Sequence, residues 1–231
     1  MKKMTYKYDT HVHTSEGSKC AKAGGTEMAR MYKEKGYDGI IITNHFYKGN
    51  TAIDRELPWD EWCRQYKNAY EIAKEEGDKI GLQVFYGWEY SANGTDFVTL
   101  GLDNDFLLAH EEVKEHSFDI NDYCDLVHEN GGFIIHAHPF REAVYIPYIR
   151  LLPRKVAAVE VVNAGRDDDL NRFALQYAEN YSLPFSGGSD AHNVNRTLSG
   201  IMTDYKLNSL ADIIDAIKNK KITVIEKQKP E

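Results

Sequence analysis

Histidines and carboxylates in short clusters are the residues of this chain most suited to chemistry. His11 and His13 lie two residues apart, and Asp190 and His192 repeat that spacing far downstream. Residues two apart on a strand share one face, about 6–7 Å apart at Cα, so both side chains of a pair can reach one metal ion. Hydrogen-bonded or solvent-facing histidines would show the same spacing, so one pair alone leaves both interpretations open.

The clusters follow the ends of predicted strands. His45 follows the second strand, Glu89 the third and His138 the fifth. Parallel α/β folds gather the carboxyl ends of their strands at one edge, so we expect these side chains to meet there. Asp96 precedes its strand, which favours a strand that runs the other way or is displaced. The predicted strands are Tyr6–Thr10, Gly39–Thr43, Gln83–Trp88, Phe97–Leu102, Phe133–His136, Ala157–Val162, Pro184–Gly187 and Ile222–Ile225.

Amphipathic stretches between several of these strands predict helices. Alternating strands and helices favour a barrel or an open, doubly wound sheet. No internal repeat, low-complexity tract or linker is found, so residues 1–231 are predicted to form a single domain. The predicted helices are Thr26–Lys35, Trp59–Glu76, Ile120–Asn130, Leu170–Tyr181 and Leu210–Asn219.

The composition and net charge limit the classes of protein to which this chain can belong. The net charge of −8 weighs against general affinity for nucleic-acid phosphates, although a local cluster of cations could still bind an anionic substrate. No apolar run approaches the roughly 20 residues that span a bilayer, and no signal-peptide core follows the first residues, so a cytoplasmic protein without a membrane partner is expected. Cys20, Cys63 and Cys124 are too scattered for a thiolate metal site and are expected to be buried or idle thiols.

Five motifs together resemble the PHP family, the polymerase and histidinol phosphatase domains. They are the segments 9–16 (Asp-Thr-His-Val-His-Thr-Ser-Glu), 41–45 (Ile-Ile-Thr-Asn-His), 87–89 (Gly-Trp-Glu), 136–139 (His-Ala-His-Pro) and 189–192 (Ser-Asp-Ala-His). The resemblance implies an α/β fold, a distorted (β/α)7 barrel with a metal site at the C-terminal ends of the strands. It also implies phosphoester hydrolysis through a metal-activated hydroxide at a di- or trinuclear site. A histidine and carboxylate set of this kind suits zinc, manganese or iron.

The resemblance also implies which residues hold the two or three divalent ions. Glu89 would bridge two of them, and Asp96 would replace the histidine that the family often has on the fourth strand. Glu16 is the candidate ligand of a third ion, at the place where the family usually has an aspartate. Asn44 replaces another family aspartate and could hydrogen-bond His45 without supplying charge. The full expected metal set is His11, His13, Glu16, His45, Glu89, Asp96, His138, Asp190 and His192.

Glu89, His138 and Arg141 are the expected catalytic residues, and no organic cofactor is expected. Arg141 follows the His138 motif directly, where a guanidinium could bind two phosphate oxygens; a salt bridge with Glu142 or another acid is the alternative. His136 is expected to contact a ligand or substrate, with core packing as the alternative.

The resulting hypothesis is a PHP-type hydrolase of phosphoric ester bonds that acts on a small phosphorylated molecule. A nuclease for short oligonucleotides is a second interpretation, although the acidic composition weighs against it. A non-catalytic, metal-stabilised binding domain is a third, and the nearly complete set of ligand types weighs against that. The sequence leaves the substrate, the metal and the oligomeric state open.

Overall fold

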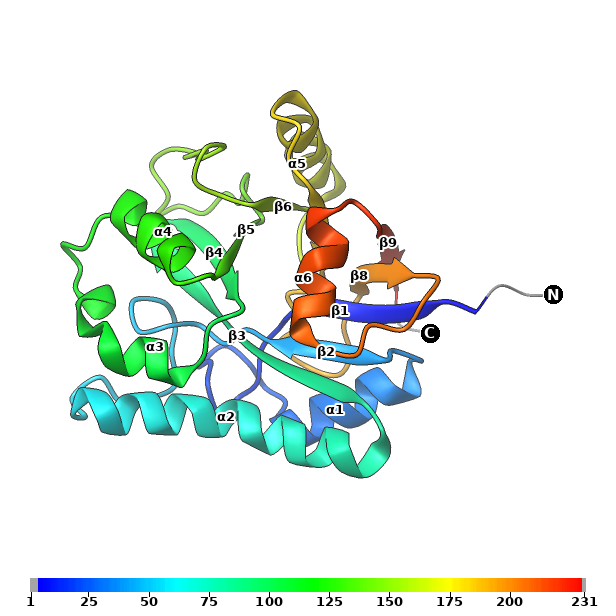
Figure 1. The fold of residues 1–231 in the computed structure, drawn as a ribbon, viewed down its shortest axis with the longest axis horizontal. Coiled ribbons are helices and arrows are strands. Elements are labelled where there is room, and N and C mark those ends of the chain that lie inside the picture. Colours follow the sequence, from blue (N-terminus) through cyan, green and yellow to red (C-terminus); the bar gives the residue numbers. More distant parts are fainter. Residues whose placement is uncertain (1–3, 230–231) are drawn as a thin grey trace.

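The computed structural model describes residues 4–229, so residues 1–3 and 230–231 of the expected domain lie outside the described residues. One nine-stranded sheet has the order β7-β6-β5-β4-β3-β2-β1-β8-β9 (Figure 1). Its strands are β1 (Tyr6–Val12), β2 (Gly39–Ile42), β3 (Gln83–Ala92), β4 (Thr95–Leu100), β5 (Phe133–Ala137), β6 (Ala158–Asn163), β7 (Phe185–Gly188), β8 (Leu198–Thr203) and β9 (Thr223–Gln228). The helices are α1 (Gly25–Glu34), α2 (Trp59–Ile80), α3 (Asn104–Ala109), the 3₁₀ helix η1 (Glu111–Lys114), α4 (Ile120–Glu129), α5 (Asp168–Asn180) and α6 (Leu210–Lys218).

Strand direction changes at β4. Strands β1, β2 and β3 are parallel to one another, as are β5, β6 and β7, whereas β4 runs antiparallel to both of its neighbours. A tight turn causes the reversal: Asn93 and Gly94 have φ angles of 52° and 86°, as a two-residue hairpin of the I′ type requires. The expectation that the Asp96 strand runs the other way is therefore confirmed. The reversal brings Asp96, at the start of β4, to the edge where Glu89 lies.

The sheet curls until β7 lies against β1. The Thr10 hydroxyl donates to the Gly187 carbonyl at 3.1 Å and lies 3.1 Å from the Ser186 hydroxyl. Glycine is needed for this approach, because a Cβ on Gly188 would lie 2.5 Å from the Cβ of His11. The result is a nearly closed, barrel-like α/β sheet, as expected in outline. The sheet has nine strands, one of which, β8, was not predicted, and they do not form the seven regular β/α units that were expected. The difference arises because β4 and β8 run antiparallel to their neighbours.

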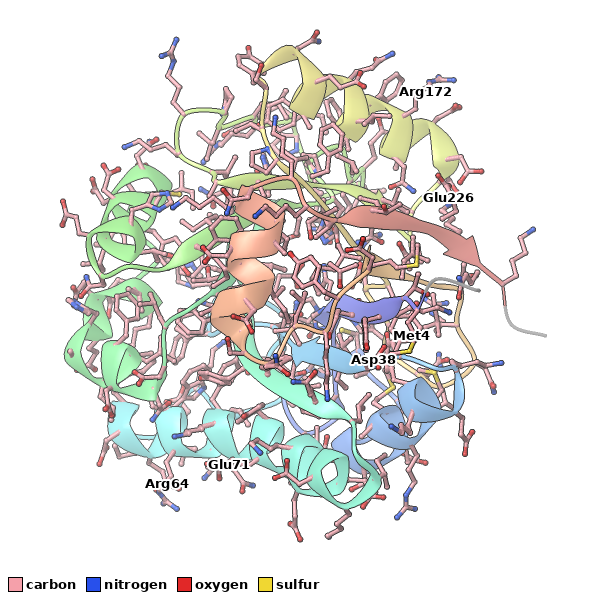
Figure 2. The ribbon with its side chains drawn as sticks, turned by 45° about the vertical axis from the view of Figure 1, so that its right-hand side comes forward. Met4, Asp38, Arg64, Glu71, Arg172 and Glu226 are labelled. Atoms are coloured by element: carbon pink, nitrogen blue, oxygen red, sulfur yellow. The ribbon has the colours of Figure 1, made fainter. Side chains whose placement is uncertain are left out.

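Helix α2 covers one side of the sheet and packs against α1 (Figure 1). Its Trp62 and Tyr66 rings stack at 4.8 Å between centroids and pack edge-on against Phe46, so the aromatic residues at the start of α2 serve packing. The charged side chains Arg64 and Glu71 point outward from the opposite face of α2 (Figure 2). Between residues 4 and 229, the structure has no helix with both the length and the apolar character needed to cross a membrane.

Candidate metal centre

The predicted histidines and carboxylates gather at the carboxyl edge of the central strands, with Asp96 reaching it from the start of β4. His11, His13 and Glu89 are almost completely buried there. His138 and Asp190 follow β5 and β7 in left-handed backbone conformations, with φ angles of 27° and 51°. Such conformations cost of order 1–3 kcal/mol for residues other than glycine, and they persist where the surrounding structure holds them. The cluster thus includes two residues whose backbone is strained.

Glu89 lies at the centre of the cluster. One carboxylate oxygen lies 3.0 Å from His138 Nε2 and 3.4 Å from His11 Nε2. The other lies 2.5 Å from His45 Nδ1 and 3.7 Å from His13 Nε2. Four imidazoles from three separate segments of the chain therefore face one carboxylate, which is the arrangement a bridging ligand needs.

Asp190 is the second carboxylate of the cluster. Its Oδ1 lies 3.3 Å from His13 Nε2 and 3.8 Å from His11 Nε2. Its other oxygen accepts a hydrogen bond of 2.8 Å from the guanidinium of Arg166. Asp190 therefore joins the two N-terminal imidazoles to a cation from the loop after β6.

Hydrogen bonds fix the orientation of the two rings on β1. His11 Nδ1 lies 2.9 Å from Glu160 Oε1, and His13 Nδ1 lies 3.0 Å from Ser18 Oγ. Because the Glu160 carboxylate can only accept, its partner His11 carries a proton on Nδ1, which leaves Nε2 as the atom of this ring that could bind a metal. In Ser18, Oγ donates to the side chain of Asn44 at 3.0 Å, so it accepts from His13 Nδ1 in the same way. Both Nε2 atoms are therefore presented to the carboxylates as potential ligands.

Electrostatics keeps the carboxylates ionised. Burial raises the pKa of Glu89, but the imidazoles of His45 and His11 outweigh it and hold that pKa well below its usual value. Asp190 follows the same pattern, with His11 as the largest opposing influence on its pKa. Burial, assisted by His192 and His45, holds the pKa of His13 well below its usual value, which favours a neutral ring. Ionised carboxylates and a neutral imidazole are the protonation states in which these groups bind metals.

Buried polar atoms without a hydrogen-bond partner show whether divalent ions would fit this cluster. Among the described residues, His11 Nε2, His13 Nε2, His45 Nδ1 and Glu89 Oε2 are buried and make no well-directed hydrogen bond, although the last two atoms lie 2.5 Å apart. Unsatisfied buried polar atoms are costly, and bound cations would satisfy these four. The side chains also form compact groups of potential ligands, with donor atoms within 4.8 Å of one another: His11/His13/Glu89, Glu89/Asp96/His138, His13/His45/His192 and His11/His138/Glu160. The donor set fits more than one divalent ion.

Glu16 is the one predicted ligand that lies away from the cluster. Its carboxylate accepts hydrogen bonds of 3.1 Å from the backbone N–H of Gly25, at the start of α1. A carboxylate is favoured there by the positive end of the helix dipole. Asn44 also differs from expectation, because its side chain binds Thr14 and Ser18 rather than the ring of His45.

Cys20 lies where the sequence placed no ligand. Its Sγ is 3.1 Å from His45 Nε2, and its thiol also interacts with His192. Burial raises the pKa of the Cys20 thiol, but the hydrogen bonds with the two histidines outweigh burial and lower it to about 6. Cys63 and Cys124 lie in the core as expected, and burial raises the pKa of each to about 12. The spacing of the cysteines could not single out Cys20, because its partners come from distant segments.

A cavity of about 770 Å³ opens beside the cluster, and cationic side chains line it. Arg141 donates to Asp96 at 2.7 Å and to the Tyr145 hydroxyl at 2.6 Å, so the acid that it pairs with is Asp96 and not Glu142. Arg166 also lines the cavity and carried only a weak signal in the sequence, as a cation shortly after a strand. The other cations of the lining are Lys48 and Arg150.

His136 lies in the core behind the cluster. Its ring stacks on Phe97 at 5.0 Å between centroids, and its Nδ1 lies 3.5 Å from the Tyr177 hydroxyl. Core packing, the alternative for this residue, is therefore the role that the structure supports. Burial and, to a smaller extent, the nearby His138 lower the pKa of His136 to about 3.

The pKa of His136 predicts an effect on acid stability. A histidine in the unfolded chain titrates near its ordinary value of 6.5, so between pH 6.5 and about 3 the unfolded state binds a proton that the folded state does not. The free energy of unfolding therefore falls as the pH drops through this window. His136→Phe should reduce that slope by up to about 1.4 kcal/mol per pH unit, measured by urea unfolding of metal-free protein. Equal slopes in both proteins would contradict the assignment.

Comparisons with known proteins give one partial family match and several similar folds. Residues 169–222 match the PHP_C family, which is described as PHP-associated. No curated protein matches the chain. A two-domain protein from Bacteroides vulgatus, containing a predicted PHP-like metal-dependent phosphoesterase, is similar with a TM-score of 0.70 and 18% identity. That comparison covers 97% of this chain and 65% of the other, so this chain spans less than two thirds of that protein.

Two further structures are similar. PsfC from Pseudomonas syringae has a TM-score of 0.64 and 19% identity, over 93% of this chain and 89% of its own. An amidohydrolase from Chromobacterium violaceum, with bound sulfate and no metal, has a TM-score of 0.57 and 14% identity, over 81% and 88%. At these identities the likenesses establish the fold. The PHP-associated match covers residues 169–222, a segment that includes Asp190 and His192.

Proposed function

We propose that the chain is a metal-dependent hydrolase of phosphate esters and that its substrate is a small phosphorylated molecule. The observation that carries the proposal is the set of four buried donor atoms without a well-directed hydrogen bond, beside a cavity whose lining includes the cations Lys48, Arg141, Arg150 and Arg166. The donor atoms fit divalent ions, and the cations fit the negative charge of a phosphate.

One ion would be held by His11, His13, Glu89 and Asp190, and a second by Glu89, His138 and Asp96. His45 and His192 would hold a third. When bound, such ions lower the pKa of a water molecule and neutralise charge on phosphoryl oxygens. Glu89 and His138 act by keeping their donor atoms fixed, since strands β3 and β5 and their hydrogen bonds hold both residues before any substrate arrives.

Arg141 and Arg166 would bind the phosphate. Each guanidinium is oriented by a carboxylate of the cluster, Asp96 and Asp190 respectively. Each also keeps a buried Nε–H without a hydrogen-bond partner among the described residues. Guanidinium groups can donate two parallel hydrogen bonds to phosphate oxygens, so these side chains supply both charge and orientation.

The size of the cavity favours a small substrate. Pockets for small molecules are commonly about 300–1,000 Å³, and the cavity of about 770 Å³ falls in that range. A long single strand of nucleic acid would need an extended cationic groove with stacking aromatic residues. The net charge of −8 disfavours such a groove over most of the surface.

The test is hydrolysis of a substrate panel by protein loaded separately with zinc, manganese or iron. The panel contains phosphomonoesters of sugars, short oligonucleotides and N-acyl amides. We expect cleavage of phosphomonoesters, with activity lost on chelation and recovered when metal is returned. Undiminished hydrolysis by metal-free protein would refute the mechanism, and cleavage of amides alone would refute the substrate class.

Arg141→Ala provides a second arm of the same test. Removal of a phosphate contact should raise KM or lower kcat/KM by about tenfold or more. Arg172→Ala is the matched control, because Arg172 points outward from α5 (Figure 2) and pairs with Asp169 of the same helix. Equal kinetics in the two variants would exclude the phosphate role of Arg141.

A further inference from the structure

The sulfur of Cys20 lies beside the third group of potential ligands. His13, His45 and His192 place their donor atoms within 4.8 Å of one another, and His13 Nε2 is buried without a hydrogen-bond partner. The ring of His13 lies 4.2 Å from that of His192 and 4.4 Å from that of His45. Glu16, the carboxylate expected beside these rings, is instead bound to the start of α1. A third ion at this place therefore needs a different ligand.

Cys20 lies where such a ligand would be, beside His45 and His192. Its Sγ lies 3.1 Å from His45 Nε2, and His192 is its other partner. Zinc binds sulfur at about 2.3 Å and imidazole nitrogen at about 2.0–2.1 Å, so two ligands of one ion lie little farther apart than this sulfur and nitrogen. The thiol also lines the cavity together with the two histidines.

The loop that carries Cys20 is fixed on both sides. Ser18 pairs with Thr51 in an isolated β-bridge, and its hydroxyl binds His13, His45 and Asn44. On the other side, the backbone N–H of Lys22 donates to the carbonyl of His192 at 2.7 Å. The same residues that orient the imidazoles thus also hold the thiol among them. A loop held by so many contacts to neighbouring ligands places its thiol in advance for a shared ion.

We infer that Cys20 is a thiolate ligand of the third ion, together with His45 and His192. The inference rests on the metal centre of the proposed function. A thiolate gives this position a soft sulfur donor. The two ions that share Glu89 would have only nitrogen and oxygen donors. Sulfur ligation favours zinc or iron over manganese and magnesium at this position. The third site thus differs chemically from the other two.

Cobalt(II) is the probe for this ligand, because a thiolate bound to cobalt gives a charge-transfer absorption band that nitrogen and oxygen ligands do not give. The wild-type protein loaded with cobalt should show the band. Cys20→Ser should lack the band and bind one ion fewer per chain, measured by elemental analysis. Cys20→His should keep the number of ions without the band, because imidazole replaces the sulfur.

Two control variants separate this sulfur from its alternatives. Glu16→Gln should keep both the band and the number of ions, because its carboxylate lies at α1. Cys63→Ala should keep them as well, since Cys63 is buried in the core. Alkylation gives an independent measurement: Cys20 should react in metal-free protein and be protected in loaded protein.

The outcomes are distinguishable. A full complement of bound cobalt with no sulfur band, or a band that persists in Cys20→Ser, would overturn the role of Cys20 and leave the proposed function standing. If Glu16→Gln binds one ion fewer and Cys20→Ser keeps the full number of ions, the third ligand is Glu16 and not Cys20. A wild-type protein that binds no divalent ion would overturn the metal-dependent function and this inference together.

Discussion

Glu89→Gln should reduce kcat/KM by about 10³-fold or more, a loss of about 4 kcal/mol of transition-state stabilisation. The carboxylate of Glu89 faces His11, His45 and His138 together. An amide keeps the shape of the side chain, but it offers one weaker oxygen donor and no charge. It therefore cannot bridge two ions. The measurement is steady-state kinetics on the best phosphomonoester of the panel, together with the metal content of the purified variant.

Glu76→Gln is the matched control for this change. Glu76 is also a buried glutamate with a cationic partner, since Arg30 lies 2.6 Å away, but it belongs to α2 and lies outside the cluster. It should retain activity and bound metal, with at most a change in thermal stability. Activity of Glu89→Gln within tenfold of the wild type would show that Glu89 does not bridge catalytic ions.

Glu160→Gln should weaken metal binding by about 10–100-fold without removing any ligand. Glu160 Oε2 accepts hydrogen bonds from the backbone of His138 and from Asn163, each at 2.9 Å. These two donors would hold the amide oxygen of a glutamine in that place and turn its NH₂ group toward His11. His11 Nδ1 would then have to accept, so the ring proton would move to Nε2 and block the atom that faces Glu89. Calorimetric titration of metal-free protein with zinc measures the loss.

Ser18→Ala is the comparison for this tautomer effect. It removes the partner of His13 Nδ1 without presenting an opposing donor, so the loss of affinity should be smaller than that of Glu160→Gln. Unfolding of the metal-free variants gives the independent measure of folding. A Glu160→Gln protein that is folded and binds zinc with wild-type affinity would exclude a role for Glu160 in setting the tautomer of His11.

The sequence predicted the edge of the sheet at which the polar residues meet, for a simple physical reason. Parallel strands end on the same side, so His11, His45 and His138, which follow different strands, must come near one another. The reversed strand was also foreseeable, because Asp96 precedes its apolar segment instead of following it. The tight Asn93-Gly94 turn, which produces the reversal, was a local signal that the strand prediction did not use.

The loop after β1 could not be predicted in the same way. Whether Glu16 or Cys20 faces the histidines depends on hydrogen bonds that Asn44 accepts from Ser18, 26 residues away, and from Thr14, 30 residues away. The order of residues after the end of a strand does not show in which direction their side chains point. Strand β8 was missed for a related reason, because its interior Gly200 breaks the apolar pattern and its partner β1 is distant in the sequence.

The contact between β1 and β7 also bears on the order of assembly. The hydrogen bond from Thr10 to Gly187 joins residues 177 positions apart, and Asp9 binds the backbone of Ser189 across 180 positions. A chain that has not yet brought these strands together has His11 and His13 but lacks Asp190 and His192 beside them. Closing so long a loop costs conformational entropy, and the binding free energy of ions that bind only after closure would offset part of that cost. In the proposed metal centre, binding of the ions at Asp190 and His192 would therefore come late in folding, and the ions would link the first and last thirds of the chain.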